Sequence, residues 1–194
     1  MVEQADQRPS AVLRRLIFGY RVSQAIHVAA TLGIADLLKE GARTSDDLAA
    51  ATGTHPATLY RLLRALTSVG VFQEESDGRF ALTPLGDGLR SDAAAPVAPA
   101  AHYIGRPHHW QIWGDLLHSV RTGENANHHV HGMSGWEYRA QHPEEGAAFD
   151  AWMTSRPQPS CGRAGGRWAG RGRCWWSTGC SGRRMRAPIR SYPT

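Results

Sequence analysis

The sequence predicts a mainly α-helical protein, with an N-terminal winged helix that carries a small β-hairpin and further helices after it. Apolar residues recur with helical spacing through most of the first 155 residues. A helix, turn, helix and hairpin pattern occupies residues 45–82, which is the order of a winged helix. The 194 residues, 41% of them hydrophobic and 20% charged, are enough to bury a globular core.

The first helix is expected from residue 12 to about residue 30. Its leading apolar side chains follow the i, i+3, i+4, i+7 rule: Leu13, Leu16, Ile17 and Tyr20. Its later apolar residues spread around the helix, so one face suits a core and another suits a second subunit. A short helix over residues 34–38 is expected next, closed by Gly41.

The winged helix is predicted by local signals. Thr44 with an acid at Asp47 matches a capping pattern, so a helix should cover residues 45 to about 52. Thr54 and Pro56 begin the clearest helix, which ends near Gly70. Its apolar stripe is Leu59, Leu62, Leu63 and Leu66. Residues 71–75 and 79–82 flank a glycine-containing turn and predict the hairpin.

Beyond the hairpin, residues 93–101 are rich in Ala and Pro and predict a connector. One helix should then present a shared apolar face before Gly123, made of Trp110, Trp113, Leu116, Leu117 and Val120. A polar, histidine-rich loop should follow it. Two short helices separated by Pro143 are expected between residues 135 and 155.

The basic charge belongs to the C-terminal residues alone. Residues 1–155 hold 13 Lys and Arg against 17 Asp and Glu, a net −4, whereas residues 156–194 hold nine Arg and no acid, a net +9. Cys161, Cys174 and Cys180 also lie there, without a C-x-x-C pair, so neither a zinc site nor a disulfide framework is expected. No apolar run is long enough to span a membrane and no secretory signal is readable, so we expect a cytoplasmic protein without a membrane partner.

A winged helix suggests a DNA-binding transcription regulator as the alternative function. The exposed face of its main helix offers only Arg61 and Arg64 as cations, and the hairpin carries more acids than bases. Because phosphate contacts dominate affinity for DNA, assembly is the favoured role and no nucleic-acid partner is expected. The Arg/Gly-rich tail with its tryptophans could hold single-stranded nucleic acid, a less favoured alternative.

Histidines are frequent between residues 108 and 131: His108, His109, His118, His128, His129 and His131. No carboxylate or Cys stands beside them at ligand spacing on a predictable helix face, so they are interpreted as solvent-exposed loop residues and no metal site is predicted. Residues 1–155 also lack a nucleophilic serine elbow, a zinc-protease motif, a P-loop and an intact G-x-G-x-x-G.

Six segments together resemble the N-terminal part of bacterial S-adenosylmethionine-dependent small-molecule O-methyltransferases. They are VLRRLIFGYRVSQAIHVAATLGIADLL, TSDDLAAATG, LYRLLRALTSVGVF, PLGDGLR, WQIWGDLLHSVRTG and HGMSGWEYRAQHPEE. The resemblance covers roughly residues 10–155. It implies a winged-helix dimerisation domain over residues 10–92, a helical linker or lid over residues 93–155, and a homodimer.

The resemblance also implies S-adenosylmethionine as the methyl donor and an aromatic or polyketide-like hydroxyl as the acceptor. The family's donor-binding strand and its histidine base, both on a Rossmann-like domain, have no matching position here, so this chain is expected neither to bind the donor nor to catalyse, and no catalytic residue is assigned. By resemblance, Met153 is expected near the donor, and Met133, Trp136 and Tyr138 are expected to line the approach to it. Core packing explains each of the four equally well.

Residues 156–194 are interpreted as a disordered or out-of-frame tail, with the chain truncated or frameshifted near codon 155. The codons of Cys174-Trp-Trp-Ser-Thr178 nearly fix their nucleotides. Reading them one base earlier gives Val-Val-Asp, the start of the family's donor-binding motif, when Ser177 is encoded by TCG. The nucleotide sequence in the neighbouring frame tests this hypothesis. The alternative is a native Arg-rich tail.

Overall fold

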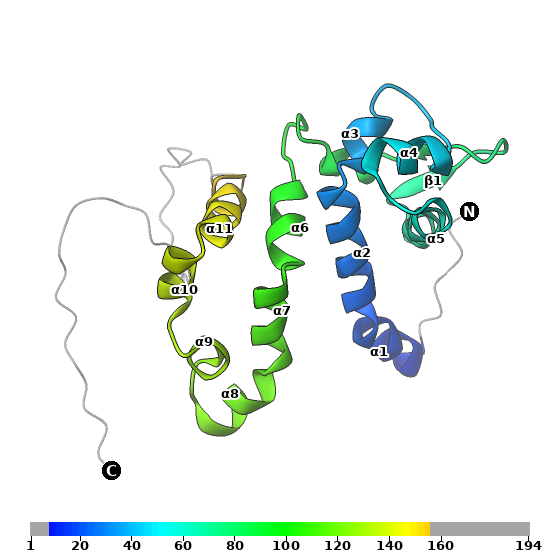
Figure 1. The fold of residues 1–194 in the computed structure, drawn as a ribbon. Helices are drawn as coiled ribbons and strands as arrows, with labels where there is room; N and C mark the ends of the chain where they lie inside the picture. The colour runs from blue at the N-terminus through cyan, green and yellow to red at the C-terminus, as the bar shows by residue number, and fades with distance from the viewer. Residues whose placement is uncertain (1–7, 156–194) are drawn as a thin grey trace, which may run out of the picture. The chain divides into compact units, whose positions relative to one another are not determined.

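The computed structural model describes residues 8–155, which form eleven α-helices, one short 3₁₀ helix and one two-stranded antiparallel sheet (Figure 1). The predicted mainly α fold with a small hairpin is confirmed. The expectations for residues 156–194, including the out-of-frame tail and the cysteines, lie outside the described residues.

The first predicted helix is two helices, α1 (Pro9–Ile17) and α2 (Gly19–Thr31). The break is at Phe18, whose backbone has φ −87° and ψ 0°, outside the helical region. Gly19 follows it and is a weak helix former, so the apolar periodicity continues across a point where the backbone turns. The predicted helix α3 (Ile34–Leu38) is confirmed and follows Gly33, which has φ 63°.

The winged helix forms as predicted. Helix α4 (Ser45–Thr52) is capped by Thr44, whose side chain accepts a 3.1 Å hydrogen bond from the Asp47 amide. Helix α5 (Pro56–Thr67) buries Leu59, Leu63 and Leu66. Strands β1 (Phe72–Glu74) and β2 (Phe80–Leu82) pair antiparallel, with Phe72 opposite Leu82.

Phe72 and Phe80 are fully buried between the hairpin and the helices. They join the leucines of α5, Ile34 and Leu38 of α3, and Leu48 of α4 in one core. The hairpin therefore packs its apolar side chains against helices α3, α4 and α5 and completes the core of the winged helix.

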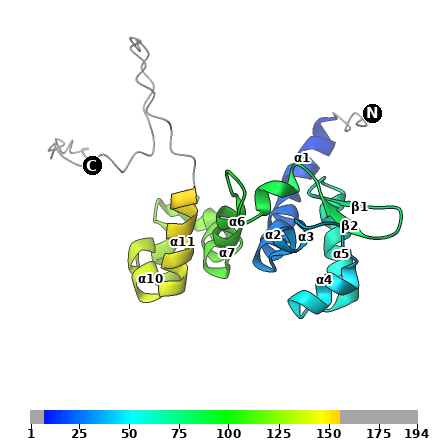
Figure 2. The ribbon, with the colours of Figure 1, turned by 90° about the horizontal axis from the view of Figure 1, so that it is seen from above.

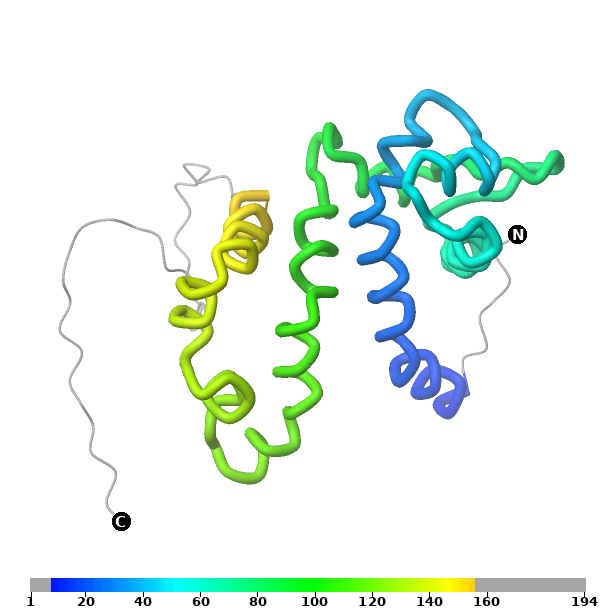
Figure 3. Tube along the Cα trace, viewed as in Figure 1, coloured from blue at the N-terminus to red at the C-terminus, as the bar shows by residue number. Residues whose placement is uncertain are grey.

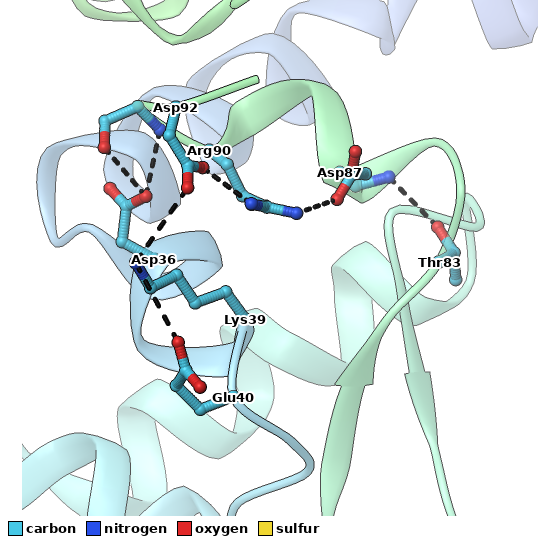
Figure 4. Close-up of polar contacts among 9 residues, drawn as sticks. Asp36, Lys39, Glu40, Thr83, Asp87, Arg90 and Asp92 are labelled. Atoms are coloured by element: carbon cyan, nitrogen blue, oxygen red, sulfur yellow. Dashed lines mark hydrogen bonds and ion pairs between the residues drawn. The ribbon is translucent and has the colours of Figure 1, made fainter. Parts of the chain in front are cut away.

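A polar network closes the winged-helix part at the 3₁₀ helix η1 (Gly86–Leu89) (Figure 4). Arg90 bonds Asp87 and Asp92 at 2.8 Å each. Asp36 of α3 accepts hydrogen bonds from the Ser91 amide at 2.9 Å and from its hydroxyl at 3.0 Å. These contacts fix the chain where it leaves the hairpin for the second half.

Helix α6 (Ala98–Ile104) begins inside residues 93–101, so the predicted connector is wrong over its second half. Pro99 lies in the first turn of α6, where proline is tolerated because the amide there has no helical partner. Helix α6 packs between α2 and α11 (Figures 1 and 2).

The remaining helices lead away from α6 and return to it (Figure 3). Helices α7 (Pro107–Gly114) and α8 (Leu116–Thr122) replace the single predicted helix, because the backbone leaves helical geometry at Asp115. Helix α9 (Ala126–His131) lies where a histidine-rich loop was predicted, so that prediction is wrong. Its cap is the side chain of Asn125, which accepts a hydrogen bond from the Asn127 amide. Helices α10 (Gly135–Gln141) and α11 (Pro143–Ser155) confirm the two predicted around Pro143.

Several of the exposed apolar side chains of the described residues gather on two stretches. On α1 and its end they are Leu13, Leu16, Ile17 and Phe18, and on α7 and α8 they are Trp113, Leu116, Leu117 and Val120. Among the described residues, no helix is both long and apolar enough to cross a membrane.

Candidate functional site

Two of the residues predicted to face a substrate are part of, or contact, a cluster of packed rings: Tyr138 belongs to it, and Trp136 contacts its Phe149. We define this aromatic–histidine cluster as Tyr103, His108, His131, Tyr138, Phe149 and Trp152. These side chains come from helices α6, α7, α9, α10 and α11, which the chain brings together after leaving the winged helix.

Tyr103 is the buried centre of one half of the cluster. Its ring stacks on Trp152 with the centroids 5.0 Å apart, and it meets the edge of Phe149 at 5.4 Å. The face and edge contacts are the preferred arrangements of aromatic pairs. Together they hold α11 against α6.

Tyr138 is the centre of the other half and is surrounded by imidazoles. Its ring stacks on His108 at 5.1 Å and on His142 at 4.1 Å, and it lies 4.4 Å from His131 at a tilt. Tyr138 thus connects α10 to α7 and α9.

A buried carboxylate lies beside the cluster. Oε2 of Glu145 accepts a 2.6 Å hydrogen bond from Nε of Arg106 and lies 2.7 Å from Nδ1 of His108. His108 and Glu145 are both buried. The charge of the carboxylate is therefore balanced by the guanidinium, and the imidazole is not needed as a cation.

Burial sets the pKa values around this carboxylate. Removal from water lowers the pKa of His108, and the nearby Glu145 opposes that effect without overcoming it. Burial likewise lowers the pKa of His109 and raises the pKa of Tyr103. Burial therefore favours the neutral forms of His108, His109 and Tyr103 beside the Arg106–Glu145 pair.

The four residues predicted to face substrate or donor lie on different surfaces. Trp136 is 72% exposed on α10 and meets the edge of Phe149 at 5.9 Å. Tyr138, two residues later, is half-buried among the histidines. Met133 lies half-buried in the turn between α9 and α10, and Met153 is 39% exposed in the last turn of α11.

Arg139 joins the exposed part of this surface. Its guanidinium lies 4.6 Å from the ring centre of Trp136 and 4.1 Å from that of Phe149. Such cation–π contacts position both rings. Trp136 is therefore held in place although it is largely exposed.

Two expectations for the histidines are wrong. His108 is buried on helix α7 instead of exposed in a loop. Carboxylates also do lie beside histidines: Glu124 Oε2 is 2.7 Å from Nε2 of His118, and Asp115 Oδ2 is 3.8 Å from Nε2 of His129. The turn between α8 and α9 brings these side chains together, and the spacing of the residues in the sequence does not reveal these contacts.

Sequence reasoning also missed Arg106 and Glu145. The two are separated by 39 positions, and neither belongs to a recognisable motif. Their only local signals are a place just before Pro107 for Arg106 and a first-turn position in α11 for Glu145.

A separate apolar groove of about 270 Å³ lies between α2 and the α6–α7 segment. It is lined by Tyr20, Ser23, Ile104, His109, Trp110 and Trp113. Tyr20 and Trp110 meet edge to face at 6.0 Å. None of the four predicted residues lines this groove.

Two arginines of the winged helix are ion-paired within it. Arg64 on α5 lies 3.1 Å from Glu74 of β1, and Arg79 beside β2 bonds Asp77 at 2.7 Å. Ion-paired arginines have to give up these partners before they can contact phosphate.

The described residues do not fit S-adenosylmethionine. A donor of this kind is held at the carboxyl ends of parallel strands by a glycine-rich turn that opens a helix. The only β-sheet that residues 8–155 form is the two-stranded antiparallel hairpin, so they contain no parallel strands. Their positive-φ glycines lie in turns and at helix ends, as Gly78 does between β1 and β2. No step of methyl transfer is therefore assigned to these residues.

Comparison with known proteins agrees with this arrangement. Residues 14–92 match the O-methyltransferase dimerisation domain. Over 163 residues the chain is 40% identical to the mitomycin biosynthesis 6-O-methyltransferase of Streptomyces lavendulae, covering 79% of this chain and 47% of that protein.

Several solved structures are similar to this chain, among them LaPhzM and NcsB1. LaPhzM matches with a TM-score of 0.72 at 40% identity, over 75% of this chain and 44% of its own. NcsB1, an O-methyltransferase from neocarzinostatin biosynthesis bound to S-adenosylmethionine and 2-hydroxy-5-methyl naphthoic acid, matches with a TM-score of 0.61 at 37% identity, over 69% of this chain and 42% of its own.

The chain spans a little under half the length of these relatives. The alternative of a winged-helix transcription regulator is not favoured, because the matched winged helix is a dimerisation domain. Residues 14–92 therefore belong to the O-methyltransferase dimerisation domain family, and about three quarters of the chain is similar to bacterial O-methyltransferases.

Proposed function

We propose that the described residues are the dimerisation half and part of the substrate-facing wall of an O-methyltransferase of secondary metabolism. The proposal rests on the exposed apolar surface of α1, next to a winged helix that is sealed on its own core. Residues 10–92 assemble the homodimer, and residues 93–155 connect it to the site of methyl transfer. A cytoplasmic location and the lack of nucleic-acid and membrane partners stay predictions.

Dimerisation through α1 explains why its apolar side chains face outward. Leu16 is 70% exposed, and its neighbours Leu13 and Ile17 are exposed on the same short helix. Burying such side chains against a second copy contributes about 25 cal/mol per Å² of apolar area removed from water. A contiguous patch of this kind is typical of an interaction surface.

The test is the mass of the particle in solution. We expect a dimer by sedimentation equilibrium for the parent, and a monomer for Leu16→Glu, because a charge cannot be buried there without a partner. Leu85→Glu is the matched control, since Leu85 is 64% exposed outside α1 and α2. A dimer that survives Leu16→Glu, or that Leu85→Glu disrupts equally, would contradict the role of α1.

The acceptor proposed for the full reaction is an aromatic hydroxyl compound. NcsB1 is bound to a hydroxynaphthoic acid, a planar aromatic acid. In our chain the exposed ring of Trp136 would contribute to the wall of the acceptor site. The places of Tyr138 and Met133 near the acceptor, and of Met153 toward the donor, stay predictions. A flat aromatic ring that edge and cation–π contacts hold in place suits the recognition of a flat ligand.

A chimera separates the wall from the chemistry. Residues 1–155 would replace the aligned part of the mitomycin biosynthesis 6-O-methyltransferase, which supplies the rest of the enzyme. We expect methyl transfer, and we expect Trp136→Ala in the chimera to raise KM more than it lowers kcat, because it removes binding area and no reacting group. An inactive chimera that still dimerises would overturn the wall and leave the dimerisation proposal standing.

The present chain by itself is proposed not to bind the donor. Calorimetry with S-adenosylmethionine should show no binding heat. Saturable heat, or methylation of an aromatic acceptor by the purified chain, would contradict this part of the proposal.

A further inference from the structure

Three ligand-type side chains meet where α8 joins α9. One potential ligand atom from each of Asp115, His118 and His129 lies within 4.8 Å of the other two. Asp115 precedes α8, His118 lies in the first turn of α8, and His129 is on α9. The turn at Gly123, with φ 76°, brings the two helices together.

The two imidazoles lie face to face. The ring centres of His118 and His129 are 3.6 Å apart and the ring planes differ by 14°. Nε2 of His129 is 3.8 Å from Oδ2 of Asp115, which is too far for a hydrogen bond but close enough to share an ion. A tetrahedral zinc ion with bonds of about 2.1 Å holds its ligand atoms about 3.4 Å apart. On binding, the two imidazole rings must therefore tilt away from each other, and the three ligand atoms must move slightly closer together.

The carboxylate of Asp115 supplies a second observation. Its Oδ2 atom is screened from solvent and has no hydrogen-bond partner among the described residues. Leaving such an acceptor unsatisfied destabilises the fold, and more so when the acceptor is charged. A bound cation would satisfy it.

Glu124 completes the arrangement from outside. Its Oε2 atom lies 2.7 Å from Nε2 of His118. Donation from Nε2 to this carboxylate leaves Nδ1 of His118 as the ring atom with a free lone pair. Metal-binding histidines commonly use their second nitrogen in this way, which orients the ring and increases its basicity.

We propose that Asp115, His118 and His129 bind one zinc-type divalent transition-metal ion, with Glu124 as a positioning residue. Two imidazoles and one carboxylate suit zinc better than magnesium or calcium, which prefer all-oxygen sites. The ion joins α8 to α9 and leaves a coordination position for water. The site is distinct from the aromatic–histidine cluster, with which it shares no residue.

The test uses the full chain without a histidine tag, in a background where Cys161, Cys174 and Cys180 are changed to Ser so that thiolates do not compete. After chelator treatment, zinc chloride is titrated by calorimetry, and cobalt is titrated while its visible absorption is followed. We expect saturable binding of one ion per chain and a rise in Tm, since an ion that binds the folded state stabilises it.

Variants locate the ion. We expect His129→Ala and Asp115→Asn to abolish the stoichiometric binding, and Glu124→Gln to weaken it by about 10–100-fold. His128→Ala is the matched control, because His128 is the exposed neighbour of His129 on the same helix. Far-UV circular dichroism shows whether each variant is folded, and Asp115→Asn keeps the test decisive if His129→Ala is not.

The proposal is overturned if the parent binds no zinc, or if His128→Ala and His129→Ala lose binding equally. Binding that persists in the double variant His118→Ala/His129→Ala would assign the ion to other histidines and would also overturn it. None of these outcomes depends on methyl transfer or on dimerisation.

Discussion

The carboxylate of Glu145 lies 2.6 Å from Nε of Arg106 and ties the first turn of α11 to the residue just before α7. Glu145 is 7% exposed, and the hydrogen bond it accepts raises the pKa of Arg106 further above its ordinary value. The pair lies beside His108, so it also anchors the aromatic–histidine cluster. The Arg106–Glu145 pair therefore connects the start of α7 to the start of α11.

Removing the charge of Glu145 should therefore destabilise this half. Glu145→Gln keeps the shape of the side chain but leaves the Arg106 guanidinium without its counterion. Because the Arg106 side chain is partly exposed, we expect a loss of about 1–3 kcal/mol in the free energy of unfolding, less than for a fully buried pair. Urea unfolding followed by tryptophan fluorescence measures it.

Glu144→Gln is the control for that measurement, since Glu144 is the exposed neighbour in the same helical turn. Its expected effect is within about 0.5 kcal/mol. Equal losses in the two variants would mean that the Arg106–Glu145 pair contributes nothing specific.

Close packing of α6 against α2 leads to a second prediction. Gly105 ends α6, and a Cβ atom placed there would overlap the imidazole of His27. His27 is itself held by a 3.0 Å contact between its Nδ1 and the carbonyl oxygen of Ala101. Gly105→Ala should therefore cost about 1–3 kcal/mol through overpacking, and not through backbone strain, because φ at Gly105 is −81°.

Gly114→Ala is the contrasting change. Gly114 lies in α7, and a Cβ atom there meets nothing within 4 Å. Alanine is the better helix former, so we expect a gain of about 0.5–1 kcal/mol. Thermal unfolding of both variants would refute the packing argument if Gly105→Ala proved as stable as Gly114→Ala.

The parts of the fold that the sequence predicts well are those with local signals. The Thr44 cap, the leucines of α5 and the glycine turn of the hairpin each specify an element within a few residues. The breaks at Phe18 and Asp115 were missed because the apolar periodicity continues across them. Helix α9 was missed because its sequence is polar, and its stability comes from an Asn125 cap and from packing against other helices.

The candidate site is predictable only in part for the same reason. Sequence and resemblance place Trp136 and Tyr138 on one helix, but they do not say which side chain faces the interior. Side chains two residues apart on a helix point to nearly opposite sides. Contacts with His108 of α7 and His131 of α9 place Tyr138 on the interior side. The burial of His108 follows from Glu145 and Tyr138, which are distant in sequence.

Buried histidines make the stability of this half dependent on pH. Burial lowers the pKa of His108, His109 and His102 in the folded chain. Near pH 6 the unfolded chain therefore binds more protons than the folded chain, and the unfolding free energy must rise with pH there. As pH falls below the ordinary histidine value of about 6.5, protons favour the unfolded chain and stability is lost.

We expect urea midpoints to be nearly constant above about pH 7.5 and to fall steadily between about pH 6.5 and pH 5. His108→Gln should reduce the slope, because glutamine takes up no proton. His128→Gln, a change at an exposed position, should keep the slope of the parent. If His108→Gln and His128→Gln give the same slope, protonation of the buried imidazole is not what couples this half of the chain to pH.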